Sequence, residues 1–403
     1  MHFASVRFFA VLLVSTSLAA GTAADARAFQ SLYQFQGGAD GDASVDRLLL
    51  DNSGNLYGVT TPNDDVLGTV FKLAPDGTET VLHAFQYVSL QASVPTGGVV
   101  MDAQGNLYGE AKNGGAYLCP EISNANPDCG SVYKLATDGT MTTIVSFQGG
   151  ADGGGPLGGL SIDSTGNLYG TTKYDGASGG CGGGGGCGTV FKIAPDGTKT
   201  VLYSFTGHSD GAKSTGGLAI DGQGNLYGTT TLGGLGQGTV FKLATDGTET
   251  ALYAFSGSDG SQPANGLVLD ASGNLYGTTP TGGSGGYGEA YKLAPDGTLT
   301  VLYAFSNASG DGVYPNGGMA MDKKGNLYGS TAAGGKGCKS FGCGTVFQIA
   351  RNGTYKQIAQ LKGGTAHNPV GGVVADSAGN VYGSAFGSSK DPNQLGILFA
   401  VQK

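Results

Sequence analysis

One five-residue motif, Gly-Asn-Leu-Tyr-Gly, recurs seven times along this chain, once with Val in place of Leu. The copies begin at Gly54, Gly105, Gly166, Gly224, Gly273, Gly325 and Gly379, so successive copies are 49 to 61 residues apart. A period of this length, with several strand-like segments in each unit, is typical of radial or linear repeat architectures. The motif therefore constrains the fold strongly, although it names no ligand.

Glycine content points the same way. The chain has 78 Gly among 403 residues, more than twice the usual share of about 7%. A Gly inside a helix costs about 1 kcal/mol relative to Ala, so long helices are disfavoured. The absence of a strict Gly triplet argues against collagen, and regular apolar runs argue against disorder. These features favour an all-β protein.

The fourth repeat illustrates the four strands that we expect in each unit. Gly216–Asp221, Leu226–Thr230, Gly238–Leu243 and Thr250–Phe255 are short apolar segments rich in β-forming residues. An Asp-x-x-Gly-Asn turn separates the first two segments, and Asp246-Gly247 between the last two is a strong hairpin signal. Four antiparallel strands repeated radially describe a blade of a β-propeller.

The two ends of the chain complement each other. The last repeat has only three strand-like segments, 371–376, 380–384 and 396–401. The missing fourth strand, with the Leu-Tyr-x-Phe signature of the other repeats, lies near the N-terminus as Ser31–Phe35. We therefore predict one seven-bladed propeller over residues 29–403, in which the N-terminal strand completes the last blade and removes two sheet edges. An open solenoid is the alternative.

Residues 1–28 resemble a signal peptide and short leader. Arg7 precedes an apolar run of 13 residues, Phe8–Ala20, which is too short to span a bilayer, and small residues follow. We expect cleavage between Ala20 and Ala28, and a soluble protein that is secreted, periplasmic or on the cell surface. The net charge of −9 argues against nucleic-acid or anionic-membrane partners, and no second span is expected. We expect a monomer.

The six Cys form three local pairs. Each pair lies between the second and third strand of its repeat: Cys119 with Cys129, Cys181 with Cys187, and Cys338 with Cys343. An even number of Cys in an exported chain favours three disulfides, each worth about 2 kcal/mol for so short a loop. Metal binding is the alternative, but the spacings do not match a Cys-x-x-Cys site and no His is near in sequence.

The strands can be lettered A to D outward from the propeller axis. The A–B and C–D turns are short and nearly invariant and lie on one face, whereas the B–C and D–A loops vary and lie on the other. Binding residues usually occupy variable loops on a rigid scaffold. Five acids, each followed by Gly, recur in the D–A loops: Asp40, Asp152, Asp210, Asp259 and Asp311. They are the candidate binding residues, for calcium or a sugar, although we favour the simpler explanation, an Asp-Gly turn repeated because the unit was duplicated.

Catalytic signatures are sparse. His83 replaces the Tyr of a D strand and is interpreted as structural, while His208 and His367 lie in D–A loops of different blades. No His-Glu-x-x-His or Gly-x-Ser-x-Gly motif occurs. We therefore assign no catalytic residue and no metal ligand, and we expect no cofactor other than calcium. The seven Tyr of the repeated motif are interpreted as inter-blade packing.

At these residues the chain resembles the bacterial choice-of-anchor tandem-repeat family, also named GloVer repeats. Gly188–Phe205, Asp210-Gly211, Gly216–Leu218 and Gly224–Thr230 match that family's unit nearly throughout, and the resemblance covers residues 29–403. It implies an exported repeat protein without established catalytic residues. The chain ends on a C strand, so no C-terminal sorting anchor is expected. The first blade departs from the unit, with Asp46-Arg47-Leu48 where Gly-Gly-Leu is expected.

The sequence favours a non-enzymatic binding or interaction protein that uses the D–A and B–C loop face, with a glycan or a protein as its extracellular ligand. An enzyme of the lactonase or lyase-like propeller kind, with a metal near the axis, is the first alternative. A structural cell-surface component is the second. Which side chains converge on the axis would discriminate among these functions.

Overall fold

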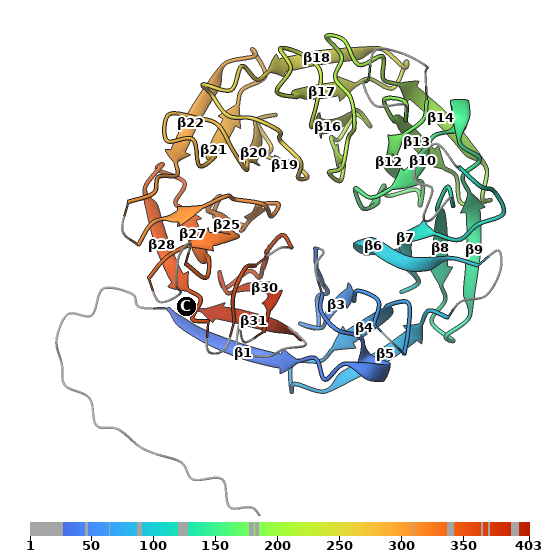
Figure 1. The fold of residues 1–403 in the computed structure, drawn as a ribbon, viewed down its shortest axis with the longest axis horizontal. Coiled ribbons are helices and arrows are strands. Elements are labelled where there is room, and N and C mark those ends of the chain that lie inside the picture. The colour runs from blue at the N-terminus through green and yellow to red at the C-terminus, as the bar shows by residue number, and fades with distance from the viewer. Residues whose placement is uncertain are drawn as a thin grey trace, which may run out of the picture.

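The computed structural model describes residues 27–44, 47–63, 65–86, 91–119, 128–176, 181, 185–308, 310–336, 342–363, 366–369, 371–387 and 395–403. Seven mainly four-stranded antiparallel sheets are arranged radially around a central opening (Figure 1). The described helical segments are two short 3-10 turns, η1 (Gly38–Asp40) and η2 (Gly150–Asp152). The predicted all-β seven-bladed propeller is therefore confirmed, whereas the predicted signal peptide lies outside the described residues.

Each blade supplies strands A to D in order from the axis. Blade 1 has β2 (Leu49–Leu50), β3 (Leu56–Val59), β4 (Thr69–Leu73) and β5 (Glu79–Ala84); blade 2 has β6 (Ser93–Met101), β7 (Leu107–Asn113), β8 (Ser131–Leu135) and β9 (Met141–Ser146). Blade 3 has β11 (Ser161–Ile162), β12 (Leu168–Tyr174), β13 (Thr189–Ile193) and β14 (Lys199–Ser204), and β10 (Gly154–Pro156) extends it. Blade 4 has β15 (Ala219–Ile220), β16 (Leu226–Thr230), β17 (Thr239–Leu243) and β18 (Glu249–Ala254).

The remaining blades follow the same order. Blade 5 has β19 (Val268–Leu269), β20 (Leu275–Thr279), β21 (Glu289–Leu293) and β22 (Leu299–Ala304). Blade 6 has β24 (Ala320–Met321), β25 (Leu327–Thr331), β27 (Thr345–Ile349) and β28 (Tyr355–Gln360), with a small sheet of β23 (Gly312–Val313) and β26 (Ala333–Gly334) beside it. Blade 7 has β29 (Val374–Ala375), β30 (Val381–Phe386), β31 (Gly396–Gln402) and β1 (Ala28–Gln34).

The ring closes through the N-terminal strand. Strand β1 pairs antiparallel with β31, from Ala28 opposite Gln402 to Gln34 opposite Ile397. The backbone N–H of Phe35 adds a hydrogen bond to the carbonyl of Gly396 at 3.0 Å. This pairing is the predicted closure, and it leaves the seventh blade with the same four strands as the others.

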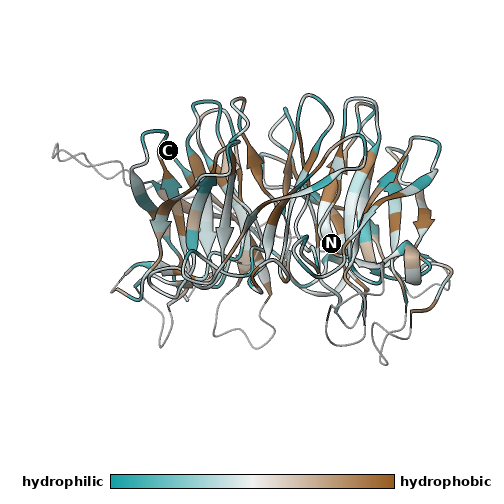
Figure 2. Ribbon diagram, turned by 90° about the horizontal axis from the view of Figure 1, so that it is seen from above, coloured by the Kyte–Doolittle hydropathy of each residue, from teal (hydrophilic) through white to brown (hydrophobic). Residues whose placement is uncertain are grey.

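The two faces of the ring differ as the strand order requires. Short, largely hydrophilic hairpin turns project from one face in side view, and longer loops project from the other (Figure 2). We name the second face, built by the D–A and B–C loops, the loop face. Its elements vary from blade to blade, whereas the hairpin face repeats.

The repeated Asp-x-x-Gly-Asn-Leu-Tyr-Gly segment is a hydrogen-bonded unit. In blade 3, the carboxylate of Asp163 accepts bonds from the backbone N–H of Thr165 (2.9 Å), the side chain of Asn167 (2.8 Å) and the hydroxyl of Tyr169 (3.1 Å). Burial alone would raise the pKa of Asp163, but these hydrogen bonds lower it to about 2. Gly166 adopts a φ of 85°, which Gly tolerates best. The other six blades repeat the Asp–Asn–Tyr contacts, so the motif is scaffold.

The hydrophobic core is divided among the interfaces between blades. Its seven buried clusters each combine residues of two neighbouring blades. At six interfaces an aromatic ring following strand D packs against the aromatic ring of strand C in the next blade, as Phe205 does on Phe241 at 5.1 Å between ring centroids. The other five pairs have centroid distances of 5.1 to 5.3 Å. The predicted inter-blade role of the motif Tyr is confirmed as well, since Tyr108 packs on the cluster that holds Leu168.

The second Gly of the repeated motif is required by packing. At Gly228 an added Cβ would lie 2.6 Å from Cζ of Phe241 and 2.8 Å from Cδ2 of Leu218. We expect Gly228→Ala to destabilise the protein by about 1–3 kcal/mol, because the crowded core must shift. Gly222, in the turn of the same blade, has no atom within 4 Å of an added Cβ. Gly222→Ala is the matched control, and urea unfolding of both variants checks the difference. Equal midpoints would contradict this account.

Candidate functional site

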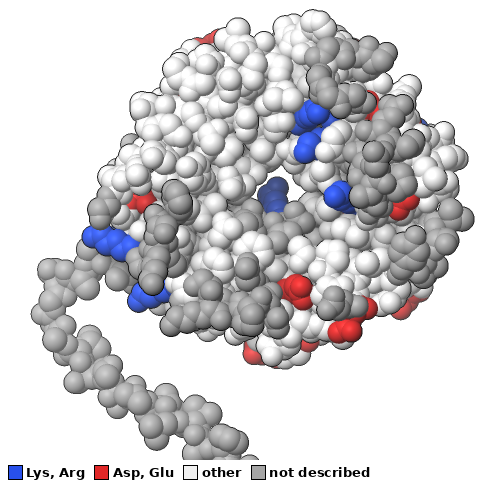
Figure 3. All heavy atoms as spheres, in the orientation of Figure 1, with Lys and Arg blue, Asp and Glu red and all other residues white. Residues whose placement is uncertain are grey.

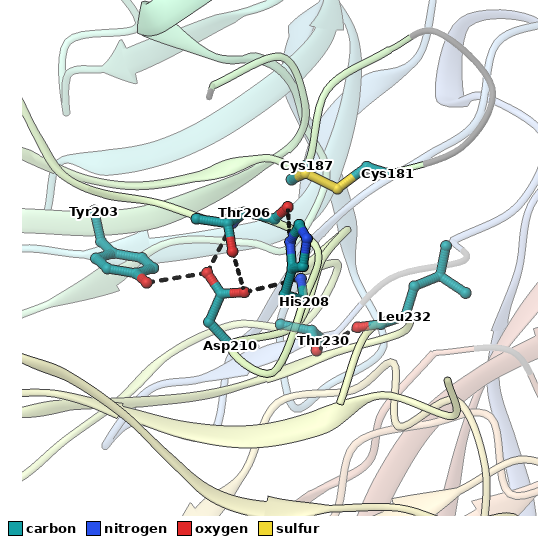
Figure 4. The surroundings of a disulfide bond; sticks show 8 residues. All are labelled: Cys181, Cys187, Tyr203, Thr206, His208, Asp210, Thr230 and Leu232. Atoms are coloured by element: carbon teal, nitrogen blue, oxygen red, sulfur yellow. Dashed lines mark hydrogen bonds between the residues drawn. A yellow bond between two sulfur atoms is a disulfide. The ribbon is translucent and has the colours of Figure 1, made fainter. Parts of the chain in front are cut away.

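The carboxylates of the five predicted binding acids accept hydrogen bonds from backbone N–H groups of their own D–A loops. Asp210 accepts hydrogen bonds from the hydroxyl of Tyr203 (3.0 Å), from the backbone N–H (2.7 Å) and hydroxyl (2.7 Å) of Thr206, and from the backbone N–H of His208 (3.2 Å), as Figure 4 shows. Asp40 and Asp259 likewise accept from the Tyr of the preceding D strand and from a loop N–H.

The remaining two acids use other partners. Asp152 accepts from the N–H of Gln148 (2.9 Å) and pairs with Lys199, and Asp311 accepts from the N–H of Ser306 (3.0 Å). Contacts with strand D, the outermost strand, place Asp40, Asp210 and Asp259 away from the axis. No group of three metal-ligating side chains occurs within the described residues. A ligand role for the five acids thus stays a prediction.

Two of these acids face a second carboxylate across a blade interface. Burial and then the Asp210 carboxylate raise the pKa of Glu249 to about 7. Burial and then Asp40 likewise raise the pKa of Glu79 to about 7. Both Glu begin the D strand of the next blade, so like charges meet where consecutive blades join.

These raised pKa values predict that stability falls as pH rises. In the unfolded chain Glu249 titrates near 4.5, so between about pH 4.5 and 7 the unfolded state loses its proton first and the free energy of unfolding decreases. After solvent screening we expect about 1 kcal/mol per Glu. Urea midpoints at pH 5.5 and 8 should differ less in Glu249→Gln than in the parent. Asp65→Asn, at an exposed side chain, is the control and should keep the full difference.

Two of the three predicted disulfides are present. Cys119 is bonded to Cys129 and Cys181 to Cys187, with Cα–Cα distances of 5.0 and 5.4 Å. Cys343 is buried, and its predicted partner Cys338 lies outside the described residues. Each bridge packs on a D–A loop: an added Cβ at Gly207 would lie 2.2 Å from Sγ of Cys181. The bridges therefore hold B–C loops against D–A loops on the loop face (Figure 4).

The three His have separate environments. His83 lies in β5 with its ring 5.0 Å from that of Phe85, and burial lowers its pKa. Nδ1 of His208 contacts the carbonyl of Thr206 at 3.0 Å, and the ring of His367 lies against Phe386. The structure gives His208 and His367 no common partner among the described residues, and His83 has the packing role that we expected.

A strained backbone position recurs on the loop face, and the sequence analysis did not identify it. Six equivalent residues at the start of strand A or shortly before it have φ between 49° and 65°; we name them the left-handed positions: Val94, Gly155, Lys213, Gln262, Tyr314 and Asn368. Five of them precede Pro, which disfavours such conformations further, and β-branched Val94 is an outlier on its own. Non-Gly residues held in this region cost about 1–3 kcal/mol each.

Hydrogen bonds across loops hold this geometry. The backbone N–H of Tyr314 donates to the carbonyl of Tyr287 at 3.0 Å, and that of Asn368 donates to the carbonyl of Cys343 at 2.7 Å. In both cases the acceptor belongs to the B–C loop of the preceding blade. The backbone at the left-handed positions is thus repeated, while their side chains all differ. Sequence alignment of the x-Pro sites would have shown this variation, although not the strain.

Three left-handed positions border one hollow of about 590 Å³. Its lining residues are Gln262, Pro280, Thr281, Tyr314, Asn316, Ala332, Ala333, Gly342 and Asn368. They come from the D–A and B–C loops of blades 4 to 7, and none is charged. The Tyr314 ring lies 5.7 Å from that of Tyr287, which supports it from one side. The volume falls within the range of about 300–1,000 Å³ typical of small-ligand sites.

The central channel is narrower than the hollow and is lined mainly by glycine. A void of about 110 Å³ at the axis is lined by Gly at or just before the A strands of six blades, by uncharged side chains such as Asn265 and Met319, and by Arg47. Neighbouring blades nearly touch there: an added Cβ at Gly97 would lie 2.4 Å from N of Gly159, and one at Gly98 2.3 Å from the carbonyl oxygen of Arg47. The backbone at the start of strand A is therefore crowded at the axis, and the irregular first blade adds Arg47 to the channel lining.

A family comparison accounts for the repeat. The model of the Gloeobacter/Verrucomicrobia repeat matches residues 20–179, 121–271 and 235–403 of this chain. The chain belongs to this repeat family. This finding confirms the GloVer-type resemblance. No curated protein matches the chain in sequence.

Two solved structures align with this Gloeobacter/Verrucomicrobia repeat protein. The extracellular domain of a hybrid two-component system from B. thetaiotaomicron aligns with a TM-score of 0.56 at 14% identity. The alignment covers 93% of this chain but only 41% of that one. A gluconolactonase from Xanthomonas campestris aligns with a TM-score of 0.43 at 20% identity, over 77% of this chain and 88% of that one. The first likeness shows the propeller fold alone.

Within the described residues, the Gloeobacter/Verrucomicrobia repeat protein has no helix that is long and apolar enough to cross a membrane. The repeated Asp–Asn–Tyr hydrogen bonds lie on the hairpin face, and the paired aromatic rings lie at the blade interfaces. The hollow, the left-handed positions and the disulfide-tied loops all lie on the loop face. The loop face is therefore the candidate binding surface.

Proposed function

We propose that this protein is an exported, non-enzymatic binding protein whose ligand occupies the hollow on the loop face. The observation that carries the proposal is the contrast between a repeated strained backbone and unlike side chains at the left-handed positions. A strained backbone conformation persists only where the surrounding contacts hold it in place, and such positions are often found at ligand sites. Three of these unlike side chains border the hollow.

The chemistry of the hollow favours a neutral carbohydrate. The side-chain amides of Gln262, Asn316 and Asn368 each offer donors and an acceptor, as sugar hydroxyls require. Tyr314 adds a flat apolar surface with a polar tip. The described residues that line the hollow include no charged side chain and so offer no counter-ion for an acidic group. A neutral sugar ring satisfies both properties better than an ionic ligand does.

Export is proposed on two grounds. The Cys119–Cys129 and Cys181–Cys187 bridges fit an oxidising compartment, and residues 1–28 have the composition of a signal peptide. A secreted, periplasmic or cell-surface location fits both. N-terminal sequencing of protein recovered outside the cytoplasm would locate the cleavage site, which we expect between Ala20 and Ala28.

A glycan array tests the binding proposal. We expect the purified protein to retain a subset of neutral glycans, and Tyr314→Ala to weaken that binding at least about tenfold, or 1.4 kcal/mol. Val94→Ala, at an equivalent left-handed position outside the hollow, is the matched control and should bind like the parent. Unchanged binding in Tyr314→Ala would exclude the hollow. Metal-dependent lactone or ester hydrolysis would instead support the enzyme alternative.

The D–A loop acids are tested separately. If calcium binds, Asp210→Asn and Asp259→Asn should abolish the binding, because Asn keeps most turn chemistry but lacks the charge that a hard cation needs. If calcium binding survives both substitutions, these acids do not bind calcium and only stabilise their own loops through hydrogen bonds.

A further inference from the structure

Arg47 is an exception within the glycine ring of the channel. Its counterparts in the other blades are Gly98, Gly159, Gly217, Gly266, Gly318 and Gly372. Arg47 is also the one charged residue among the described residues that line the channel. The first blade therefore places a single positive charge at a position where the other six blades have Gly.

The guanidinium of Arg47 has no ion-pair partner among the side chains that the structure describes. Within the part of the chain that the structure describes, no salt bridge or side-chain hydrogen bond involves Arg47. Although solvent reaches the side chain, the blades surround it, and this desolvation lowers its pKa from the ordinary value. Arg nevertheless stays charged at neutral pH. An exposed guanidinium that lines a narrow channel can donate its N–H groups to a bound anion.

Other basic side chains also lie beside the central opening (Figure 3). The ammonium groups of Lys173 and Lys213 both lie near the Tyr174 ring, at 5.4 and 5.7 Å from its centroid. Figure 3 shows Lys and Arg side chains beside and within the central opening, in a chain whose net charge is −9. A local positive potential of this kind steers small anions inward.

We propose that the central channel is a binding site for one carboxylate group, held by the Arg47 guanidinium. The proposal is independent of the glycan proposal for the hollow. The channel volume of about 110 Å³ equals that of a few water molecules, at about 30 Å³ each, which excludes a sugar ring but admits a carboxylate. Guanidinium binds carboxylates through two parallel N–H···O bonds.

Charge balance favours a carboxylate over a phosphate. One guanidinium neutralises one negative charge, whereas a phosphate dianion would leave a second charge uncompensated. A buried carboxylate already lies on the blade-2 side: Oε2 of Glu110 accepts the N–H of Gly159 at 2.8 Å, and Gly159 lines the channel. This neighbour further disfavours a doubly charged ligand.

Acetate is the probe, and Arg47→Gly is the variant. Gly is the residue of the other six blades at this position, so the variant should fold. In low-salt buffer we expect calorimetry to give a dissociation constant in the millimolar range or below for acetate, and Arg47→Gly to weaken binding at least about tenfold. Lys323→Ala, at an exposed Lys on the hairpin face, should bind acetate like the parent.

Modification of Arg by phenylglyoxal gives a second readout at the residue itself. Peptide mapping should show that acetate slows the modification of Arg47 but not that of Arg351, which lies in a hairpin turn. Binding by phosphate that is tighter than binding by acetate would overturn the carboxylate assignment. Absence of acetate binding, binding that Arg47→Gly retains, or equal protection of both Arg would overturn the site.

Discussion

Removing strand β1 is expected to lower the melting temperature of the protein by about 10 °C or more. The strand pairs with β31 over its whole length, so its loss exposes the edge of β31. It also removes Phe35, which is fully buried and packs on Phe71 of blade 1 at 5.3 Å. The interface between blades 7 and 1 would then lose both its hydrogen bonds and its aromatic contact. Calorimetry of chains that begin at residue 27 and at residue 37 measures the difference.

A chain that lacks only residues 1–26 is the control and should melt like the parent. Because the shorter chain could fail to fold, Phe35→Ala in the complete chain provides a second measurement. Removing a buried Phe typically costs about 3–5 kcal/mol, and the urea midpoint should fall accordingly. If both variants unfold like the parent, β1 does not close the ring.

The second large effect is expected at an interface between blades far from the closure. Phe305, which follows strand β22, is fully buried and lies 5.3 Å from the ring of Phe347 in blade 6. Phe305→Ala should reduce the free energy of unfolding by about 3–5 kcal/mol, because it removes a large buried side chain and leaves a cavity. Urea unfolding measures the loss.

Val301, in the same strand, is 42% exposed and serves as the control. Val301→Ala should change the free energy of unfolding by no more than about 0.5 kcal/mol. A cost for Phe305→Ala as small as that of Val301→Ala would show that the blade interfaces do not depend on the paired rings.

Scaffold and site are separated in this protein. The Asp–Asn–Tyr units stabilise the hairpin face, and the paired rings stabilise the interfaces. The loop face carries the differences between blades, such as Lys213, Gln262 and Tyr314 at equivalent left-handed positions. A rigid scaffold with variable loops on one face is a common arrangement for binding.

The sequence by itself determined the architecture. Seven copies of one motif, the four-strand pattern of each unit, and a missing last strand matched by Ser31–Phe35 together indicated a closed seven-bladed propeller. These signals are local and repeated, so each copy supports the others. The pairing of Cys119 with Cys129 and of Cys181 with Cys187 was also evident, because both bridges are local.

Only the tertiary structure decided which side chains meet. The loop acids, including Asp210, could be ligands or turn formers in sequence, and the structure shows their hydrogen bonds to their own loops and, in three cases, to outer-strand Tyr. The left-handed backbone of Tyr314 depends on a carbonyl from another loop. Arg47 looked like a local irregularity, and ring closure placed it on the axis. Convergence on an axis is a non-local property, since it depends on how all seven blades pack, and no single repeat encodes it.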